Sequence, residues 1–571
     1  MKTKRGKETS LKECLMRNLG IKSTEEINNW YQRYYDNGYR LDGLDKAKEI
    51  IESYKEKEIH IIGDYDVDGV TATSIMYFGL KYFGCEKVFY RTPKRFSEGF
   101  GLKESIIREI PENDCLIITV DNGTAAPEAV KYAKERGMKV IITDHHLPNL
   151  DTNGNLILPE ADLIINPNAI EGSADYKGYC GAGIAYKLCR HLLDNEGLSR
   201  SLEPIAAIGT IADVMELREE NYVIVRRGLE GLIKTPNLGL RALLEKLGKT
   251  EHVSATDVGF NIGPCINAPG RLIDDGSMKA VELITASNQY DAERLAEFLV
   301  QQNEIRKTQV NDATEAAIED IETNKKTGDI PIISYIPKIN EGILGIIAAK
   351  IMDKYSRPAI ILTDSEAENI LKGSARAPEG FNMKAVLDRV SKEMTNYGGH
   401  EGAAGLSIKR DNLENFREEI IKSSVYEKYL PVTDTDITYD FEVSSENIDE
   451  AADLIEMFEP HGEGNPTVMI KVPDFFNVPY GDSYKTPMGK TGIKFYGDNC
   501  TAINFQGAKL FEDIKKPEKM VLYGELSYNY FKGRKTPQII FQDFEMISEI
   551  SDEPNDTPFA DILAVRASLR S

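Results

Sequence analysis

The chain has 571 residues and a formal net charge of −23. This length exceeds what one hydrophobic core normally supports, so we expect three or four domains. The acidity excludes a protein that binds nucleic acid over a broad basic surface, and any such binding must rely on local basic groups. Seven cysteines without a CxxC pair favour reduced thiols and a cytoplasmic location, and no apolar run approaches the roughly 20 residues of a membrane helix.

The first 230 residues predict a helical region followed by a parallel sheet. Residues 1–50 place apolar side chains such as Trp30 and Tyr34 at helical spacing, which indicates amphipathic helices that pack on a neighbour. Over residues 51–230 apolar strands alternate with helical stretches, the pattern of βαβ units. We expect strands at 59–63, 115–120 and 139–143, a fourth candidate at 208–212, and helices at 70–82, 126–136 and 181–193.

The rest of the chain predicts a helical connector, a second α/β domain and an all-β domain. The connector spans residues 231–325 and ends in a long polar helix over 290–323. The second α/β domain, residues 326–430, has strands at 331–335 and 359–363 around a helix at 343–355. Short alternating segments from 431 to 548 predict an all-β barrel, and an acidic tail fills 549–571. The fold class is therefore two α/β domains joined by a long helix, with a C-terminal β domain.

Acids and imidazoles follow the predicted strands of the first α/β domain. Parallel strands present their carboxyl ends at one edge of the sheet, where such folds bind ligands. Taken alone, an acid after a strand is more often a turn residue or a helix cap. Like charges gathered at one edge repel one another unless a cation neutralises them, which favours a metal site. The candidate catalytic residues are Asp64, Asp66, Asp121, Asp144, His145, His146 and Asp213.

The ligand chemistry indicates hard divalent ions. The expected metal ligands are Asp64, Asp66, Asp121, His145 and Asp213. Oxygen donors with one imidazole and no cysteine favour manganese or magnesium over structural zinc. These carboxylates suit two ions, with Asp121 as the bridge. Two ions about 4 Å apart activate water for in-line attack on a phosphodiester, so the site predicts phosphoryl chemistry.

Neighbouring residues are expected to support these ligands. His146 is placed to donate to a phosphate oxygen as charge develops there. Asp144 would orient an imidazole or backbone group, and we place Asn122 in the same supporting layer. Asp68 either serves there too or caps a helix that starts at Val70.

Five motifs give a family resemblance. The segments DYDVDG (64–69), VDNG (120–123), TDHH (143–146), IGTIAD (208–213) and INAPGRL (266–272) resemble the DHH phosphoesterase superfamily in order and spacing. Further segments, PKRFSEGFG (93–101), GSAR (373–376) and GGHEGAAG (398–405), with the long C-terminal extension, are similar to the RecJ family of single-strand-specific 5′-to-3′ DNA exonucleases. The likeness covers about residues 40 to 545. It implies a DHH domain, a DHH-associated domain and a nucleic-acid-binding OB-fold.

The resemblance also implies ligands, partners and context. It implies two Mn²⁺ or Mg²⁺ ions, single-stranded DNA as substrate, 5′-mononucleotides as products, and a role in DNA repair and recombination. A single-strand-binding protein and a RecQ-type helicase are implied partners, and the protein is expected to be a monomer. The resemblance makes Ser374 and Arg376 the expected contacts of the 5′-phosphate. Arg95 and His400 lie in glycine-bordered loops and are further candidates, although the loop of His400 could be a flexible turn. Arg271 could clamp phosphate or pair with Asp274 or Asp275.

Local basic and aromatic groups could line a path for the strand. The basic groups are Lys94 with Arg95, Arg226 with Arg227, Arg306 with Lys307, and Lys532 with Arg534 and Lys535. Tyr528, Tyr530 and Phe531 could stack on bases, or they could simply form a hairpin turn and core.

Two other classes stay open at the level of sequence. A DHH phosphoesterase acting on oligonucleotides or cyclic dinucleotides would share the metal site and both α/β domains, but it would not need the last 140 or so residues. A non-enzymatic partner of a replication complex would lack metal ligands, whereas every ligand position is present here.

Overall fold

The computed structural model describes residues 2–36, 38–151, 154–429, 437–481, 483–489, 491–508, 511 and 519–547. The chain forms two compact units. The first unit contains residues 1–270, 274–300 and 437–552, and the second contains 271–273, 301–436 and 553–571. The predicted acidic tail, 549–571, lies outside the described residues.

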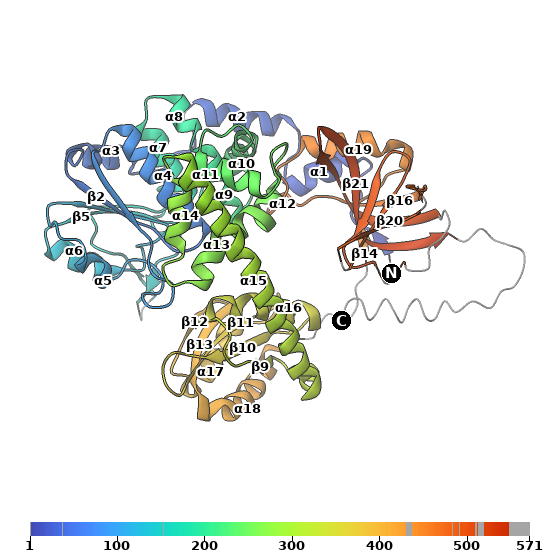
Figure 1. Ribbon diagram of the computed structural model, residues 1–571. Coiled ribbons are helices and arrows are strands. Elements are labelled where there is room, and N and C mark those ends of the chain that lie inside the picture. Colours follow the sequence, from blue (N-terminus) through green and yellow to red (C-terminus); the bar gives the residue numbers. More distant parts are fainter. Residues whose placement is uncertain are drawn as a thin grey trace, which may run out of the picture. The chain divides into compact units, whose positions relative to one another are not determined.

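The first unit contains a five-stranded parallel sheet, of which β2 and β5 are labelled in Figure 1. Its strand order is β3-β2-β4-β5-β8, with β2 at Glu58–Ile62, β3 at Lys87–Arg91, β4 at Leu116–Val120, β5 at Lys139–Thr143 and β8 at Leu163–Ile165. The chain winds outward from β2 to β3 and then in the other direction through β4, β5 and β8. The crevice for a ligand in such a sheet lies where the winding reverses, which is between the carboxyl ends of β2 and β4.

Helices cover both faces of this sheet because successive strand residues point to opposite sides. Ile59, Ile61, Leu116 and Ile118 belong to the core with α4 (Val67–Phe83), α7 (Gly181–Leu192) and α9 (Glu203–Ala212). On the other face, strand residues such as Ile117 pack with α5 (Glu104–Arg108) and α6 (Pro127–Glu135). A small hairpin of β6 (Asn149–Leu150) and β7 (Leu156–Ile157) follows β5.

The helical segments of the first unit brace this core. They are α1 (Leu11–Leu19), α2 (Glu25–Asp36), α3 (Leu44–Ser53), α8 (Glu196–Arg200), α10 (Glu219–Leu232), α11 (Leu238–Lys246), α12 (Ala255–Asp257), the π-helix η1 (Val258–Ile262), α13 (Gly263–Leu272) and α14 (Ser277–Ile284). Tyr34 is buried, and Trp30 and Tyr31 pack on the core, so the predicted packing face near the N-terminus is confirmed. The long polar helix is also confirmed as α15 (Gln289–Thr323), and the boundary between the two units falls inside it, after Val300.

The C-terminal part of the first unit is a seven-stranded sheet. Its order is β15-β16-β20-β21-β19-β18-β17, and the strands are β15 (Phe441–Glu442), β16 (Met469–Phe476), β17 (Thr486–Met488), β18 (Gly492–Tyr496), β19 (Thr501–Asn504), β20 (Lys519–Phe531) and β21 (Arg534–Ile547). Helix α19 (Ile448–Met457) and helix α1 share its core. Strand β1 (Lys2–Lys4) pairs with β14 (Ile437–Tyr439). The N-terminal helix therefore belongs to the core of the β domain.

The second unit is also an α/β domain, as predicted. Its sheet has the order β12-β13-β11-β10-β9, built from β9 (Ile332–Tyr335), β10 (Ala359–Asp364), β11 (Ile370–Arg376), β12 (Asn396–Gly399) and β13 (Ala403–Lys409). Helix α16 (Leu344–Tyr355) packs on one face and helices α17 (Met383–Arg389) and α18 (Leu413–Ser424) pack on the other. Within this sheet β9 and β10 pair in parallel, and the other neighbouring strands pair antiparallel.

One predicted strand is wrong. Residues 208–212 form the end of helix α9. The segment Ile208-Gly209-Thr210-Ile211-Ala212 has β-branched residues that favour a strand, but it is buried on nearly every side. A run that is apolar all round gives no periodicity to separate a buried helix from a buried strand.

A buried ion pair ties α7 to α10. The Lys187 ammonium lies 2.8 and 3.0 Å from the Glu220 carboxylate oxygens, and both side chains are almost fully buried. The hydroxyl of Tyr179 donates to the same carboxylate. Burial lowers the pKa of Lys187, whereas Glu220 opposes that shift. Removal of the acid would leave an unpaired buried cation, which is costly.

We expect Glu220→Gln to destabilise the first unit by about 3 kcal/mol or more. The matched control is Glu196→Gln, which removes an exposed pair with Arg200 and should change stability by less than about 1 kcal/mol. Differential scanning calorimetry of the full chain measures both. Equal unfolding temperatures for the two variants would show that the buried pair has no special weight.

Candidate metal centre

The predicted acids gather where the winding of the parallel sheet reverses. Asp64 follows β2 and Asp121 follows β4, so they lie on either side of the crevice. Asp144, His145 and His146 follow β5, the next strand. Asn122 joins the first two strand ends, because its amide donates to Ile62 O at 3.0 Å and Val120 O at 2.9 Å.

Helix α4 begins one turn earlier than predicted, and this changes the roles of two acids. Asp66 is the N-cap, and its carboxylate accepts from Gly69 N at 3.0 Å. The alternative in which Asp68 caps a helix that starts at Val70 is therefore wrong. Asp68 lies in the first turn, where its oxygens accept from Gly181 N at 2.6 Å and Ala182 N at 2.8 Å. The N-terminus of α7, whose dipole favours an anion, thus holds this carboxylate.

Asp213 reaches the cluster from a helix rather than from a strand. It is the residue at which α9 ends, and its side chain is 27% exposed, more than the other acids that face His145. Helix α9 packs against α4 and α7 in the same core. Asp213 therefore reaches the crevice from the layer of helices that packs on one face of the sheet.

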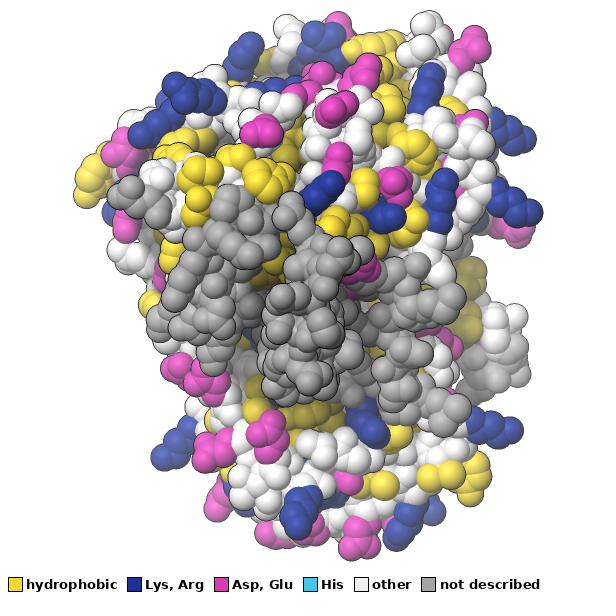
Figure 2. Space-filling view, turned by 90° about the vertical axis from the view of Figure 1, so that its right-hand side faces the viewer, with side chains coloured by type: hydrophobic (Ala, Val, Ile, Leu, Met, Phe, Trp, Pro, Cys, Tyr) yellow, Lys and Arg dark blue, Asp and Glu magenta, His cyan; other side chains and the backbone are white. Residues whose placement is uncertain are grey.

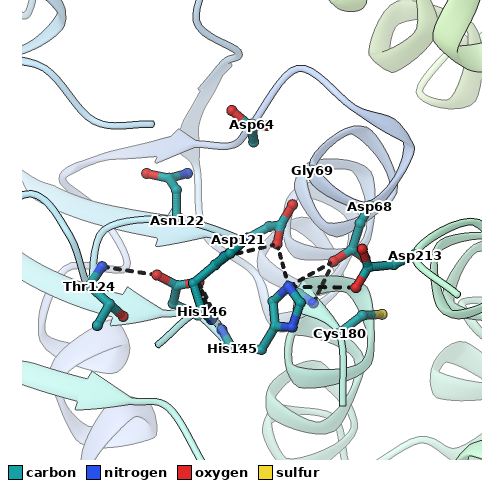
Figure 3. Close-up of polar contacts among 12 residues, drawn as sticks. Asp64, Asp68, Gly69, Asp121, Asn122, Thr124, His145, His146, Cys180 and Asp213 are labelled. Atoms are coloured by element: carbon teal, nitrogen blue, oxygen red, sulfur yellow. Dashed lines mark hydrogen bonds and ion pairs between the residues drawn. The ribbon is translucent and has the colours of Figure 1, made fainter. Parts of the chain in front are cut away.

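The side chains converge into three overlapping groups, each with ligand atoms within 4.8 Å of one another. The groups are Asp64, Asp66 and Asp121; Asp68, His145 and Asp213; and Asp121, His145 and His146. His145 Nε2 is central: it lies 3.1 Å from an Asp121 oxygen, 3.6 Å from Asp213 and 3.8 Å from Asp68 (Figure 3). Asp121 and His145 each belong to two groups, which is the arrangement expected around two neighbouring ions.

Asp121 is held in place by a close backbone approach. Its φ of 61° is a left-handed conformation that is uncommon for residues other than glycine. A Cβ added at Gly181 would stand 2.4 Å from Asp121 Cβ and 2.8 Å from its Cα. Only glycine fits there, so the first residue of α7 supports Asp121 by contact and Asp68 by hydrogen bonding. Sequence reasoning missed this role, although the small residues Gly181, Ala182 and Gly183 signal a close approach.

Asp144 and His146 form an oriented pair. The Asp144 carboxylate lies 2.8 Å from His146 Nδ1 and accepts from Thr124 N at 2.9 Å. Burial alone would lower the pKa of His146, but the hydrogen bond to Asp144 and its charge raise it to about 9. Burial opposes, but does not overcome, the lowering of the Asp144 pKa by His146. The pair fixes the His146 ring and leaves Nε2 for another partner.

The acids of the cluster are not neutralised by the protein. Burial and then Asp66 raise the pKa of Asp64 to about 8, and burial and then Asp68 raise that of Asp213 to about 8. Burial raises the pKa of Asp121 well above its usual range. The buried Asp121 Oδ1 faces His145 Nε2 at 3.1 Å, but it accepts no well-aligned hydrogen bond from a described residue. A set of hard oxygen donors with a buried carboxylate oxygen that lacks a hydrogen bond fits divalent cations.

Arg95 lies beside this cluster. Its guanidinium stands 4.4 Å from the centre of the Tyr65 ring, and its buried NH1 has no hydrogen-bond partner among the described residues. The backbone of Arg95 is fixed by a bond from its N–H to Asp274 O at 2.9 Å. A buried donor left unpaired at the edge of an acidic site is suited to an anionic ligand.

The second unit carries the other predicted substrate contacts. Ser374 and Arg376 lie on β11, and Arg376 NH1 is 3.4 Å from Ser374 Oγ. A Cβ on Gly345, in the first turn of α16, would stand 2.7 Å from Arg376 NH2. His400 is exposed in the turn between β12 and β13. Arg271 donates to Gly342 O at 3.1 Å.

Arg376 is partly buried and lacks an acidic partner among the described residues. Desolvation lowers its pKa, and it forms no ion pair with a described acidic residue. A guanidinium, a hydroxyl and the first turn of a helix are together suited to an anionic ligand.

Several predicted strand-path residues are engaged within the protein. Arg226 donates to two backbone carbonyls and Arg227 pairs with Glu203 at 3.0 Å. Tyr528 OH donates to Asp453 at 2.7 Å, and Tyr530 OH donates to Glu456. On the face shown in Figure 2, basic and acidic side chains of the described residues are interspersed rather than gathered in one basic patch. Arg226 and Arg227, which already have partners within the protein, are therefore less available to bind a ligand.

Comparison with known proteins supports the resemblance. The DHH family, N-terminal domain, matches residues 58–211, the DHHA1 domain matches 331–424 and the RecJ OB domain matches 439–543. A single-stranded-DNA-specific exonuclease RecJ of Bacillus subtilis (strain 168) is 35% identical over 89% of this chain and 64% of its own length. The protein of the same name from Haemophilus influenzae is 32% identical over 94% of this chain and 96% of its own length. The chain thus spans less than two thirds of the Bacillus relative.

A solved structure agrees over most of the chain. The crystal structure of RecJ in complex with Mn²⁺ from Thermus thermophilus has a TM-score of 0.72 and 24% identity, and the match covers 95% of this chain and 79% of that one. The parallel sheet with acids and imidazoles at its carboxyl edge, followed by a second α/β unit, places the protein in the DHH class. Within that class, the chain belongs to the RecJ family.

We expect Gly181→Ala to weaken Mn²⁺ binding at least tenfold, because the new methyl group displaces Asp121. The matched control is Gly183→Ala in the same turn, whose Cβ would meet nothing closer than 3.4 Å. Isothermal titration calorimetry with Mn²⁺ on both variants, with circular dichroism to confirm folding, measures the effect. Equal affinities in the two variants would contradict the role given to Gly181.

Proposed function

We propose that the protein is a metal-dependent 5′-to-3′ exonuclease that hydrolyses single-stranded DNA to 5′-mononucleotides in DNA repair and recombination. The observation that carries the proposal is the convergence of three overlapping groups of ligand atoms, each within 4.8 Å, two of which share Asp121 and two of which share His145. The relatives named above are single-stranded-DNA-specific exonucleases by name. The β domain, which matches the RecJ OB domain, adds a fold suited to single strands.

Two Mn²⁺ or Mg²⁺ ions are the proposed cofactors. Asp64, Asp66, Asp121, His145 and Asp213 are the predicted ligands, and the contacts of Asp68 with the same imidazole add it to the donor set. When bound, the ions supply positive charge for the phosphate oxygens and acidify the attacking water. This chemistry requires no protein nucleophile.

The protein's own groups orient the reaction. Asp144 engages His146 Nδ1, so we assign His146 Nε2 as the donor to a non-bridging phosphate oxygen. The His146 side chain is 42% exposed, which leaves it accessible to a substrate. The helix α7 terminus fixes Asp68, and Asn122 fixes the two strand ends, so the carboxylates need little reorganisation when substrate binds.

The second unit supplies the proposed end-binding site. The Arg376 guanidinium, Ser374 and the first turn of α16 suit a terminal phosphate because they offer a partly buried positive charge with several donors. This group of donors supports digestion from a 5′-phosphate end. Arg271 and His400 are proposed as further contacts along the strand.

A phosphoesterase for short or cyclic nucleotides is the alternative. It would use the same metal centre, but the β domain, whose core includes helix α1, has no place in that activity. A comparison of a 5′-labelled single strand, a dinucleotide and a duplex separates the two functions.

We also propose a cytoplasmic monomer that works with a single-strand-binding protein and a RecQ-type helicase. All seven cysteines are free, which is consistent with a reducing compartment. Among the described residues, no helix has the length and apolar character to cross a membrane.

Asp121→Ala should reduce nuclease turnover by at least 10³-fold while single-strand binding stays within about threefold, because the bridging ligand is lost but the binding surfaces remain. The control is Asp114→Ala, which lies at the other end of β4 and is exposed. Single-turnover digestion and fluorescence anisotropy measure the two quantities. Loss of binding with normal hydrolysis would remove the bridging role.

Arg376→Ala should abolish any preference for a 5′-phosphorylated strand over a 5′-hydroxyl strand. The matched control is Lys372→Ala on the same face of β11, because Lys372 is already paired with Glu341 at 2.6 Å. The ratio of kcat/KM for the two substrates measures the effect. An unchanged ratio in Arg376→Ala would place the phosphate elsewhere.

A further inference from the structure

An exposed aromatic ring stands beside the metal centre without a role in the site described so far. Phe100 is 40% exposed. Its ring contacts His146 edge to face, with centroids 5.3 Å apart and planes at 72°. His146 is itself 42% exposed on its side chain. The two rings therefore border the accessible side of the cluster together.

The loop that carries Phe100 is fixed to the metal centre at one end. Gly101 N lies 3.4 Å from Asp64 Oδ1, and Leu102 N donates to Asn122 at 3.1 Å. Gly99 and Gly101 flank the ring with φ of 76° and 71°, a conformation that glycine adopts without strain. The backbone thus passes close to the acids and the aromatic ring projects from it.

Asp274 fixes the other end of the loop. Its carboxylate accepts from Phe96 N at 2.8 Å, from Ser97 N at 3.1 Å and from Ser97 Oγ at 2.6 Å. The N–H of Arg95 donates to the backbone oxygen of Asp274 at 2.9 Å. An exposed apolar ring on a loop held at both ends is a preformed surface rather than a flexible one, so little entropy is lost when a flat ligand covers it.

We propose that Phe100 is a substrate-binding residue whose ring stacks on a nucleobase next to the scissile phosphate. The inference rests on the proposed function, because it requires a polynucleotide substrate. Stacking uses the π-face that every base shares, so it provides contact without sequence preference. The position beside His146, the proposed phosphate donor, places the base contact one nucleotide unit from the chemistry. Asp274 acts as a positioning residue for this platform.

A cycle of protein and substrate changes tests the contact. Phe100→Ala should lower kcat/KM roughly 5- to 150-fold, the range expected for loss of one base stack. A substrate with an abasic first or second nucleotide should show a similar loss with the wild-type protein at the stacked position. With Phe100→Ala, that abasic substrate should cause no further loss, and Phe100→Trp should retain activity. The matched control is Phe89→Ala, because Phe89 is 47% exposed and stacks on His60 away from the metal centre.

A second readout does not depend on turnover. In the Asp121→Ala variant, the fluorescence of 2-aminopurine at the stacked position should be quenched when the strand binds. In the double variant that also carries Phe100→Ala, this quenching should be lost. Mn²⁺ titration of Phe100→Ala should match the wild type, which excludes damage to the metal centre. Equal losses on normal and abasic strands would overturn the proposal and assign the ring to support of His146 alone. Failure of the wild type to digest any single strand would instead refute the proposed function.

Discussion

The repulsion among buried carboxylates at one edge of a parallel sheet is the constraint on which the rest of the site depends. Asp64, Asp68 and Asp121 are each at most 2% exposed, and oxygens of Asp68 and Asp121 lie 3.8 and 3.1 Å from His145 Nε2. Burial raises the pKa values of Asp64 and Asp121, because an uncompensated buried charge is expensive. Bound divalent cations would balance this negative charge, and the free energy of metal binding would offset the cost of burying it.

Backbone N–H groups, rather than basic side chains, hold Asp66 and Asp68 in place. Asp68 is held by two N–H groups of α7, and Asp66 by the N–H of Gly69. A lysine or arginine in these places would neutralise the acids and compete with a metal ion. Backbone dipoles fix the carboxylates without removing their net charge. The glycine at position 181 allows the helix terminus to come close enough to do so.

The sequence predicts the strands, the helices that cover them and most of the cluster, because apolar runs of strand length that each end in an acid bring those acids to one edge of a parallel sheet. It does not predict that Asp213 ends a helix, because a run that is apolar all round has no readable period. The support of Asp68 by α7 is equally hidden, since Asp68 and Gly181 are 113 positions apart. Nor does the exposure of Phe100 follow from its motif, because exposure depends on how the loop is anchored at Asp274.

The acidic composition is compatible with the proposed nucleic-acid substrate because the residues that attract phosphate are distinct from the acids of the metal centre. A broad basic surface would bind duplex and single strands alike through phosphate contacts. Here the positive charge is local: within the described part of the chain, the partly buried Arg376 has no acidic partner and Arg95 keeps an unpaired donor, whereas Arg227 and Lys535 are paired with acids. A strand held by its terminal phosphate and by stacked bases needs few phosphate contacts along its length. The proposed selectivity for single strands then follows from the need for an exposed base, which a duplex conceals.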